Sequence, residues 1–241
     1  RGLGDVYKRQ VHVDTPLDEV AQIIEKYDLV AIPVLDSIGR LVGQITVDDV
    51  MDEVREQSER DYQLASGLSQ DVETDDNVFR QTTARLPWLI IGMLGGIGNS
   101  MILGNFDATF AAHPEMALYI PLIGGTGGNV GTQSSALIVQ GLANSSLDSK
   151  NTLKQVAKEA VVALINATII SLLVYTYNFI RFGAMATVTY SVSISLFAVV
   201  MFASIFGTLV PMTLERLKID PAIATGPFIA ITNDIIGMML Y

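Results

Sequence analysis

The sequence contains no cysteine and only two histidines among its 241 residues. The absence of cysteine excludes disulfides, thiol catalysis and thiolate-bound metals. His12 and His113 lie far apart in the chain, so a histidine-based metal cluster is not expected. The sequence also has no Gly-x-Ser-x-Gly motif, no metalloprotease motif and no recognisable nucleophile–base pair. We therefore expect a protein that is not an enzyme.

Positive charge is scarce in the polar part of the chain. Residues 1–79 carry 18 acidic and 7 basic side chains, whereas residues 80–241 carry 7 acidic and 8 basic ones. The acidic part lacks the clustered Lys and Arg that nucleic-acid binding requires, and it suits cations instead. The remainder is nearly neutral and apolar. This division indicates a segment in water followed by a segment in a lipid bilayer.

The N-terminal part divides into three segments. Residues 1–10 (RGLGDVYKRQ) resemble translated adapter sequence, so we leave them out of the fold and treat the chain as a fragment. Residues 11–54 predict a small α/β unit, with strands at Val11–Val13, Ala31–Leu35 and Leu41–Thr46. Its first helix is expected to begin with Thr15 as N-cap and Pro16 at the first helical position.

The pattern from Ile32 to Val50 resembles one CBS module. It reads apolar-Pro-Val-x-Asp-x-x-Gly-x-Leu-Val-Gly-x-Ile-Thr-x-x-Asp-Val. CBS modules normally pair, and one module of about 45 residues is small for an independent core. The resemblance implies a partner module, and it makes an adenine nucleotide a candidate ligand of the CBS pair.

Residues 46–79 predict an acidic connector helix and linker. Asp49, Asp52, Glu53, Glu56 and Glu59 recur at spacings of three and four, so they share one helical face or two adjacent faces. One interpretation is a solvated face with acids near the helix N-terminus, where the helix dipole favours them. The other is that a divalent cation neutralises these like charges.

Residues 80–241 predict a transmembrane domain of five spans, each close to the ~20 residues that cross hydrocarbon. The predicted spans are Leu86–Phe106, Ala117–Ala143, Ala157–Phe179, Val188–Leu214 and Ala222–Tyr241. The basic residues gather before the first span and after the second and fourth. By the positive-inside rule, we expect a multi-pass protein of the cell (inner) membrane with its N-terminus cytoplasmic and its C-terminus outside. The expected fold is an α-helical membrane protein: a five-helix bundle preceded by a partial α/β CBS module and an acidic connector helix.

One carboxylate stands inside the last predicted span. Asp234 lies 13 residues after Pro221, about 20 Å at helical rise. An intramembrane carboxylate is costly and is a functional candidate by default. The predicted spans offer it essentially no basic partner, which favours a mobile cation. A protonated Asp packed between helices is the alternative.

The stretch from Pro121 to Ser135, PLIGGTGGNVGTQSS, places five glycines in the second predicted span. Gly124, Gly128, Gly131 and Ser135 fall on one helical face. This face either packs closely against another helix or exposes backbone carbonyls. Together with the amide of Asn129 and a carboxylate, such carbonyls are oxygen ligands suited to hard cations such as hydrated Mg²⁺.

Three stretches together resemble the MgtE-type magnesium channels. They are Gly-Thr-Gly-Gly-Asn-x-Gly-x-Gln ending at Gln133, Arg-x-Pro-Trp-Leu ending at Leu89, and Asp-Pro-Ala…Gly-Pro-Phe…Asn-Asp ending at Asp234. The resemblance covers about residues 11 to 241. It implies a homodimer in the lipid bilayer, a pore between the two copies lined by the second and fifth spans, and Mg²⁺ as both transported and regulatory ion.

The resemblance also implies two sets of metal-binding residues. In the pore, Asp234 of both copies would hold the hydrated ion, with oxygens of Gly125, Gly128, Asn129 and Ala230. Cytoplasmic regulatory positions would be Asp18, Asp28, Asp49, Asp52 and Asp61, in the CBS module and in the connector, which would act as a plug. Gln57 and Arg60 stand where family members often have acids, and Thr132, Ala136 and Gly226 replace more polar residues of the pore. Because the fragment keeps only part of the regulatory region that the resemblance implies, we expect weakened inhibition by Mg²⁺ in this chain.

Two other functions remain open. A membrane-anchored sensor would bind a nucleotide at its CBS module and use the spans as an anchor. A proton- or sodium-coupled cation transporter would also contain an intramembrane carboxylate and interrupted helices.

Overall fold

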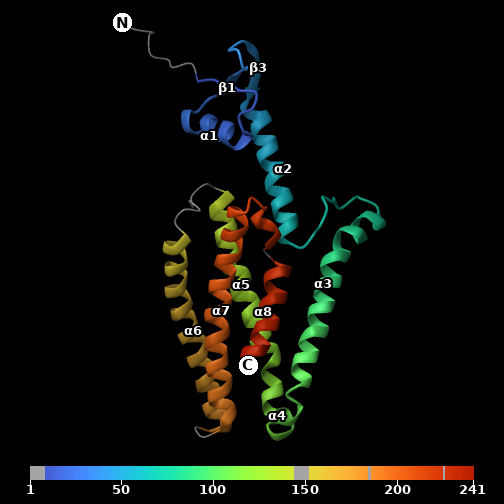
Figure 1. The fold of residues 1–241 in the computed structure, drawn as a ribbon, viewed down its shortest axis with the longest axis vertical. Helices are drawn as coiled ribbons and strands as arrows, with labels where there is room; N and C mark the ends of the chain where they lie inside the picture. The colour runs from blue at the N-terminus through green and yellow to red at the C-terminus, as the bar shows by residue number, and fades with distance from the viewer. Residues whose placement is uncertain (1–8, 144–151, 184–185, 225) are drawn as a thin grey trace. The chain divides into compact units, whose positions relative to one another are not determined.

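The computed structural model describes residues 9–143, 152–183, 186–224 and 226–241. Most of the segment 1–10, which we had set aside, therefore lies outside the described residues. The chain forms two compact units, Arg1–Asp61 and Tyr62–Tyr241, and the boundary between them falls within one helix (Figure 1).

The first unit is a three-stranded sheet with a helix packed against it. Its elements are β1 (Val11–His12), α1 (Leu17–Tyr27), β2 (Ala31–Leu35), β3 (Leu41–Thr46) and the first part of α2 (Val47–Ala65). The strand β2 is central, parallel to β1 and antiparallel to β3. Its core is small, and the fully buried side chains come from α1, β2 and α2: Val20, Ile32 and Val50. The strand bounds agree with the prediction to within one residue.

The predicted cap of α1 is wrong. The residue that precedes the helix is Pro16, in an extended conformation (φ −57°, ψ 142°), and no side chain caps the helix. The Thr15 hydroxyl oxygen instead accepts a hydrogen bond from the backbone N–H of His12 at 3.0 Å. Thr15 therefore closes the turn after β1, and α1 begins at Leu17.

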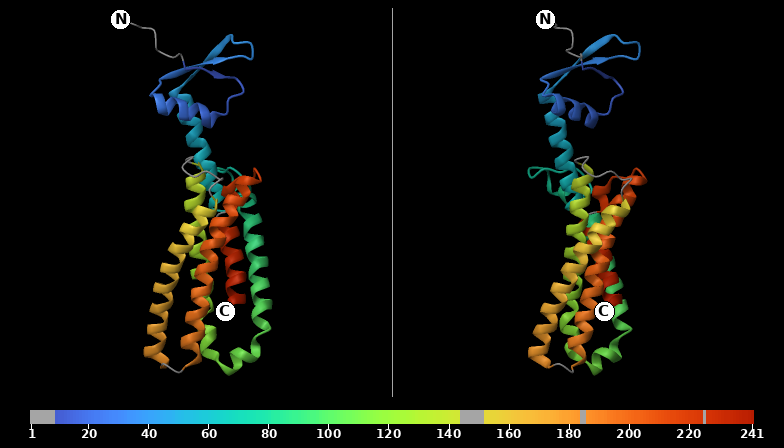
Figure 2. Two further views of the ribbon diagram at one scale, coloured as in Figure 1. Left: turned by 60° about the vertical axis from the view of Figure 1, so that its left-hand side comes forward. Right: turned by 90° about the vertical axis from the view of Figure 1, so that its left-hand side faces the viewer.

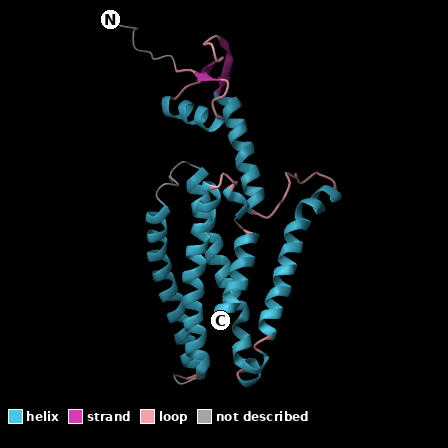
Figure 3. Ribbon diagram, in the orientation of Figure 1, coloured by secondary structure: helices cyan, strands magenta, loops and turns pink. Residues whose placement is uncertain are grey.

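The second unit is helical (Figures 2 and 3). Its elements after α2 are α3 (Val78–Gly104), α4 (Asp107–Ala112), the short 3-10 helix η1 (Pro114–Tyr119), α5 (Ile120–Ala143), α6 (Thr152–Phe182), α7 (Thr187–Arg216), η3 (Pro221–Ala224) and α8 (Pro227–Leu240). The helix α7 lies at the centre and packs against α5, α6 and α8, whereas α3 packs mainly against α8. Side chains of α5 and α7 such as Ile123, Leu196 and Val200 are completely buried.

Among the described residues, three helices are long and apolar enough to cross a membrane: α3, α6 and α7. The helix α8 is apolar but shorter, because a 3-10 turn and Gly226 precede it. The helix α5 has 24 residues, but its six glycines and its polar residues lower its hydropathy. The helices α3 and α6 begin before the predicted spans, at Val78 and Thr152, whereas α5 and α8 begin after the predicted starts, at Ile120 and Pro227.

Candidate functional site

The carboxylate of Asp234 on α8 approaches α5 where α5 has no side chains. A Cβ atom built on either Gly124 or Gly128 would lie 3.4 Å from Asp234 Oδ1, and one on Gly128 would lie 3.7 Å from Ala230 Cβ. These two glycines are buried, and Asp234 is half-buried. A larger residue at either position would occupy the space next to the carboxylate.

Within the described part of the chain, Asp234 forms no hydrogen bond or ion pair. Nor do three or more His, Asp or Glu side chains come together there in a group that could hold a metal ion. A single copy therefore supplies one acidic side chain at this place. The other oxygen atoms that the chain offers near this part of α5 belong to backbone carbonyls and to side-chain amides.

The two sides of α5 differ in exposure. The buried side carries glycines and serines together with Ile123 and Ile138, whereas the exposed side carries Gly125, Asn129 and Gln133. Of the predicted pore residues, Gly125 and Asn129 are thus exposed, Gly128 is buried beside Asp234, and Ala230 is half-buried. The predicted residues therefore gather around one edge of the α5–α8 contact, but they face in two directions.

Gly131 belongs to a helix crossing. A methyl group built on Gly207 of α7 would overlap the Gly131 carbonyl oxygen and lie 3.1 Å from Gly131 Cα. A methyl group on Gly131 would overlap the side-chain amide of Asn233 and lie 2.8 Å from Ile229 Cγ2. The glycine spacing that left two interpretations open therefore serves close packing at Gly131, as small residues do between helices in lipid.

Other parts of the chain also approach the start of α8 closely. Gly226 has φ +54°, which favours glycine, and a methyl group there would overlap the carbonyl oxygen of Ala65. A Cβ on Gly67, at φ +82°, would lie 2.6 Å from Pro227 Cγ. The last turn of α2 and the residues after it therefore lie against the entrance of α8, seven residues before Asp234.

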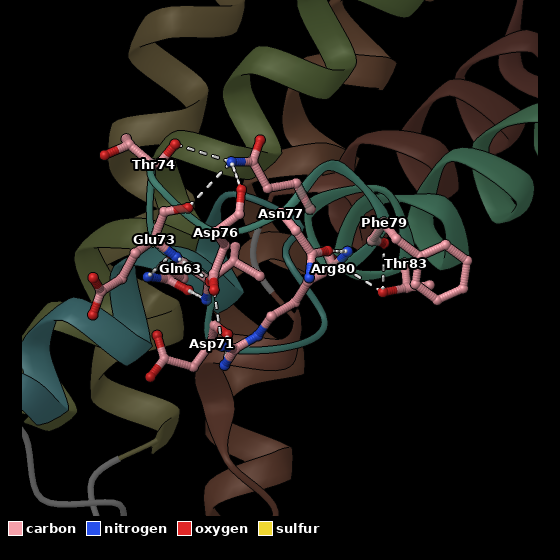
Figure 4. A network of polar contacts seen from close by, with 11 residues as sticks. Gln63, Asp71, Glu73, Thr74, Asp76, Asn77, Phe79, Arg80 and Thr83 are labelled. Carbon is pink, nitrogen blue, oxygen red and sulfur yellow. Dashed lines mark hydrogen bonds and ion pairs between the residues drawn. The ribbon is translucent and has the colours of Figure 1, made fainter.

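The linker between α2 and α3 is fixed by side chains (Figure 4). Gln63 donates to the Val72 carbonyl at 3.0 Å and accepts from the Val72 N–H at 3.1 Å. Arg80 pairs with Asp76 at 2.9 Å and donates to the Asp71 carbonyl at 3.1 Å. The Gln81 amide donates to three further carbonyls of the segment. The linker is therefore held from both helices.

The predicted regulatory aspartates are distributed along the first unit. Asp18 lies in α1, and Asp28 ends α1 in the left-handed conformation (φ 49°). Asp49 accepts hydrogen bonds from the Thr46 hydroxyl at 2.5 Å and the Thr46 N–H at 3.2 Å, and these bonds lower the pKa of its carboxyl. Asp61 accepts from the Gln57 amide at 2.8 Å.

The acidic face of α2 is partly neutralised by its own arginines. Arg60 pairs with Glu53 at 3.3 Å and with Glu56 at 3.2 Å. Arg55 approaches Asp52 at 3.9 Å and Glu59 at 3.7 Å. Exposed pairs of this kind contribute little to stability. They do show that a cation bound on this face would compete with two guanidinium groups.

Sequence reasoning missed one polar contact inside the bundle. Glu159 of α6 accepts hydrogen bonds from Ser134 of α5 at 2.7 Å and Ser204 of α7 at 2.5 Å. Glu159 lies only two residues inside the predicted third span and directly after Lys158, so neither its depth nor a lack of basic neighbours marked it as Asp234 was marked. Its two serine partners carry no signal either, because nothing in the sequence brings them to Glu159.

Comparison with known proteins agrees with these features. Residues 120–241 match the family described as "MgtE: Divalent cation transporter", and residues 9–56 match the CBS domain. The chain is 32% identical over 238 residues to "Magnesium transporter MgtE" of Bacillus subtilis (strain 168), covering 98% of this chain and 52% of that protein. It is 34% identical over 237 residues to the protein of the same name from Thermus thermophilus, covering 96% and 51%.

A third "Magnesium transporter MgtE", from Enterococcus faecalis, is 30% identical over 237 residues, covering 96% of this chain and 51% of that protein. The chain spans about half the length of the curated relatives it matches. The match includes α5 and α8, which hold Asp234 and its glycines, and it confirms a transporter family rather than an enzyme. The chain therefore belongs to the MgtE family of divalent cation transporters.

Proposed function

We propose that the chain forms a channel for hydrated Mg²⁺ and that Asp234 is its ion-binding carboxylate. The observation that carries this proposal is the unpartnered carboxylate of Asp234, beside Gly124 and Gly128 on a helix of the membrane domain. A charge inside a bilayer needs compensation. Oxygen ligands around a carboxylate suit a hard divalent cation, and a hydrated Mg²⁺ ion needs outer-shell acceptors rather than a tight cage.

A homodimer would complete this site. One chain offers one carboxylate, and the exposed side of α5, with Gly125, Asn129 and Gln133, has no partner helix among the described residues. Two copies related by a two-fold axis would bring two Asp234 side chains and two such surfaces together. The ion would then pass between α5 and α8 of the two copies.

Five crossings, with α5 and α8 completing the three long spans, would suit this arrangement. The basic residues support the orientation: Arg216 at the end of α7 donates to Thr152 at the start of α6 at 2.7 Å, so these helix ends meet. Lys154 and Lys158 lie on the same first turns of α6. By the positive-inside rule this end is cytoplasmic.

Gating by cytoplasmic Mg²⁺ follows from the same elements. The last turn of α2 lies against the entrance of α8, so a shift of α2 would change access to Asp234. Mg²⁺ bound by the acidic residues of α2 and the CBS module, among them Asp49 and Asp52, would favour one position of α2 by population shift. Because Arg55 and Arg60 already pair with acids of α2, we expect incomplete inhibition.

The test is Mg²⁺ flux into liposomes with the purified chain, Asp234→Asn and the matched control Asp107→Asn, which is exposed at the start of α4. Asp234→Asn should lower flux by at least about tenfold, the factor for each 1.4 kcal/mol of lost ion stabilisation. Asp107→Asn should conduct like the parent chain. Undiminished flux in Asp234→Asn would remove this residue from the pore.

Two further measurements separate the alternatives. Flux that follows a proton or sodium gradient steeply would indicate a coupled transporter instead of a channel. A chain that binds an adenine nucleotide but moves no Mg²⁺ would indicate a membrane-anchored sensor.

A further inference from the structure

A carboxylate outside the Asp234 site joins three helices of the bundle. Glu159 lies seven residues after the start of α6, about 10 Å along the helix. Its Oε1 accepts from the Ser134 hydroxyl of α5 at 2.7 Å and from the Ser204 hydroxyl of α7 at 2.5 Å. The two hydroxyl oxygens lie 3.0 Å apart. We call these three residues the Glu159 clamp.

The clamp is held by hydroxyl groups rather than by an opposite charge. Ser134 is 5% exposed and Ser204 is 2% exposed. The sequence of α5 contains no charged residue, and α7 has only Glu215 and Arg216, in its last turn. On α6 itself, the nearest basic residue, Lys158, points to the surface. Hydrogen bonds to an ionised acceptor are short and about twice as strong as neutral ones, so they fix the distance between the helices.

Ser134 is placed so that the clamp controls the rotation of α5. It lies on the buried side of the helix, directly after Gln133 on the exposed side. Because side chains one residue apart on a helix point in different directions, holding Ser134 against α6 and α7 directs Gln133 and Asn129 away from the bundle. The ion path proposed above uses that exposed side.

We propose that Glu159 is a positioning residue that fixes the rotation of α5 and thereby presents its exposed face to the ion path. The relevance to ion passage rests on the proposed function. The placement of α5 by Glu159 does not, and it can be measured without any transport. Replacing Glu159 with an apolar residue would remove the acceptor that both buried hydroxyls share; one hydroxyl could then donate to the other, and the second would be left without an acceptor, which is unfavourable. Replacement with Gln would keep an acceptor oxygen and remove the charge.

The test uses the absence of cysteine from the chain. Ala136→Cys places a single thiol on the exposed side of α5, half a turn beyond Ser134. Its rate of reaction with a small charged thiol reagent is measured in purified protein that carries Glu159→Gln, Glu159→Leu or neither. Loss of a hydrogen bond to a charged group should change this rate by about tenfold in Glu159→Leu. Glu159→Gln should retain most of the parent rate.

Two controls make the result specific. Ser171→Ala removes a hydroxyl that donates to the Ser193 carbonyl at 2.6 Å, between α6 and α7 but without α5, and it should leave the rate unchanged. Ser134→Ala, a milder change, should alter the rate in the same direction as Glu159→Leu, and the double variant should show no further change. The same labelling rate in the parent, Glu159→Leu and Ser134→Ala would overturn the proposal, whatever Mg²⁺ flux these variants support.

Discussion

The crossing of α5 and α7 allows a quantitative test of the packing, because backbone meets backbone there. A Cβ atom on Gly207 would overlap the Gly131 carbonyl oxygen and lie 3.1 Å from both Gly131 C and Gly131 Cα. Backbone atoms cannot rotate away, so Gly207→Ala would force the two helices apart by about 1 Å to restore ordinary contact distances. Overpacking of this kind costs about 1–3 kcal/mol.

For a chain of this size each kcal/mol corresponds to about 2–4 °C in Tm, so Gly207→Ala should lower the unfolding midpoint in detergent by about 2–12 °C. The matched control is Gly96→Ala in α3, where an added methyl group meets no atom within 4 Å. It removes a helical glycine at an open position and should be neutral or slightly stabilising. If Gly207→Ala unfolds at or above the midpoint of Gly96→Ala, the close approach of α5 and α7 is wrong.

Two further changes test single contacts. Tyr119→Phe removes the hydroxyl that donates to Asn178 Oδ1. Because Asn178 is fully buried, its unpaired oxygen should lower the free energy of unfolding by about 1–3 kcal/mol. Thermal or denaturant unfolding measures this change, and an unchanged midpoint would contradict the bond. Thr46→Val removes the hydroxyl that chiefly lowers the pKa of Asp49, so the pKa of this carboxyl should rise. A carboxyl whose pKa is lowered by folding stabilises the fold above its unfolded pKa, and this stabilisation is lost as the pH falls through the folded pKa. The free energy of unfolding of the variant should therefore fall less on acidification than that of the parent chain. The pKa is measured by NMR titration of Asp49, and an unchanged titration would contradict the Thr46 bond.

Local pattern was sufficient for the strands and the long apolar helices, but it did not predict the short helices α4 and η1 or the 3-10 turn η3 before α8. The strands Ala31–Leu35 and Leu41–Thr46 appear with their predicted bounds because β-branched residues and the turn at Asp36–Gly39 fix them locally. The apolar helices were found from composition. Their ends differ from the predictions because α3 and α6 continue as polar helix, such as Val78–Thr83, beyond the apolar run.

Tertiary contacts were not accessible in the same way. The spacing of Gly124, Gly128 and Gly131 defines one face of a helix but does not say which neighbour that face meets. The structure places the first two beside Asp234 and the third against Gly207. The partners of Glu159 were hidden for the same reason, since serines are common in such helices and only the fold selects Ser134 and Ser204. Thr15 was misassigned because a cap competes with a turn bond of similar strength.

The segment between α2 and α3 has a consequence for how this family can be recombined. Its backbone is hydrogen-bonded to Gln63 before it and to Arg80 and Gln81 after it, so this segment does not act as a flexible linker. A chimera that joins a foreign sensory module at residue 70 would keep the Arg80 and Gln81 bonds, which lie downstream of the junction, but it would lose both Gln63–Val72 bonds unless the module supplied an equivalent Gln. Exchange should succeed when the junction lies upstream of Gln63. The place where a sensory module can be exchanged in this protein therefore lies inside the helix α2.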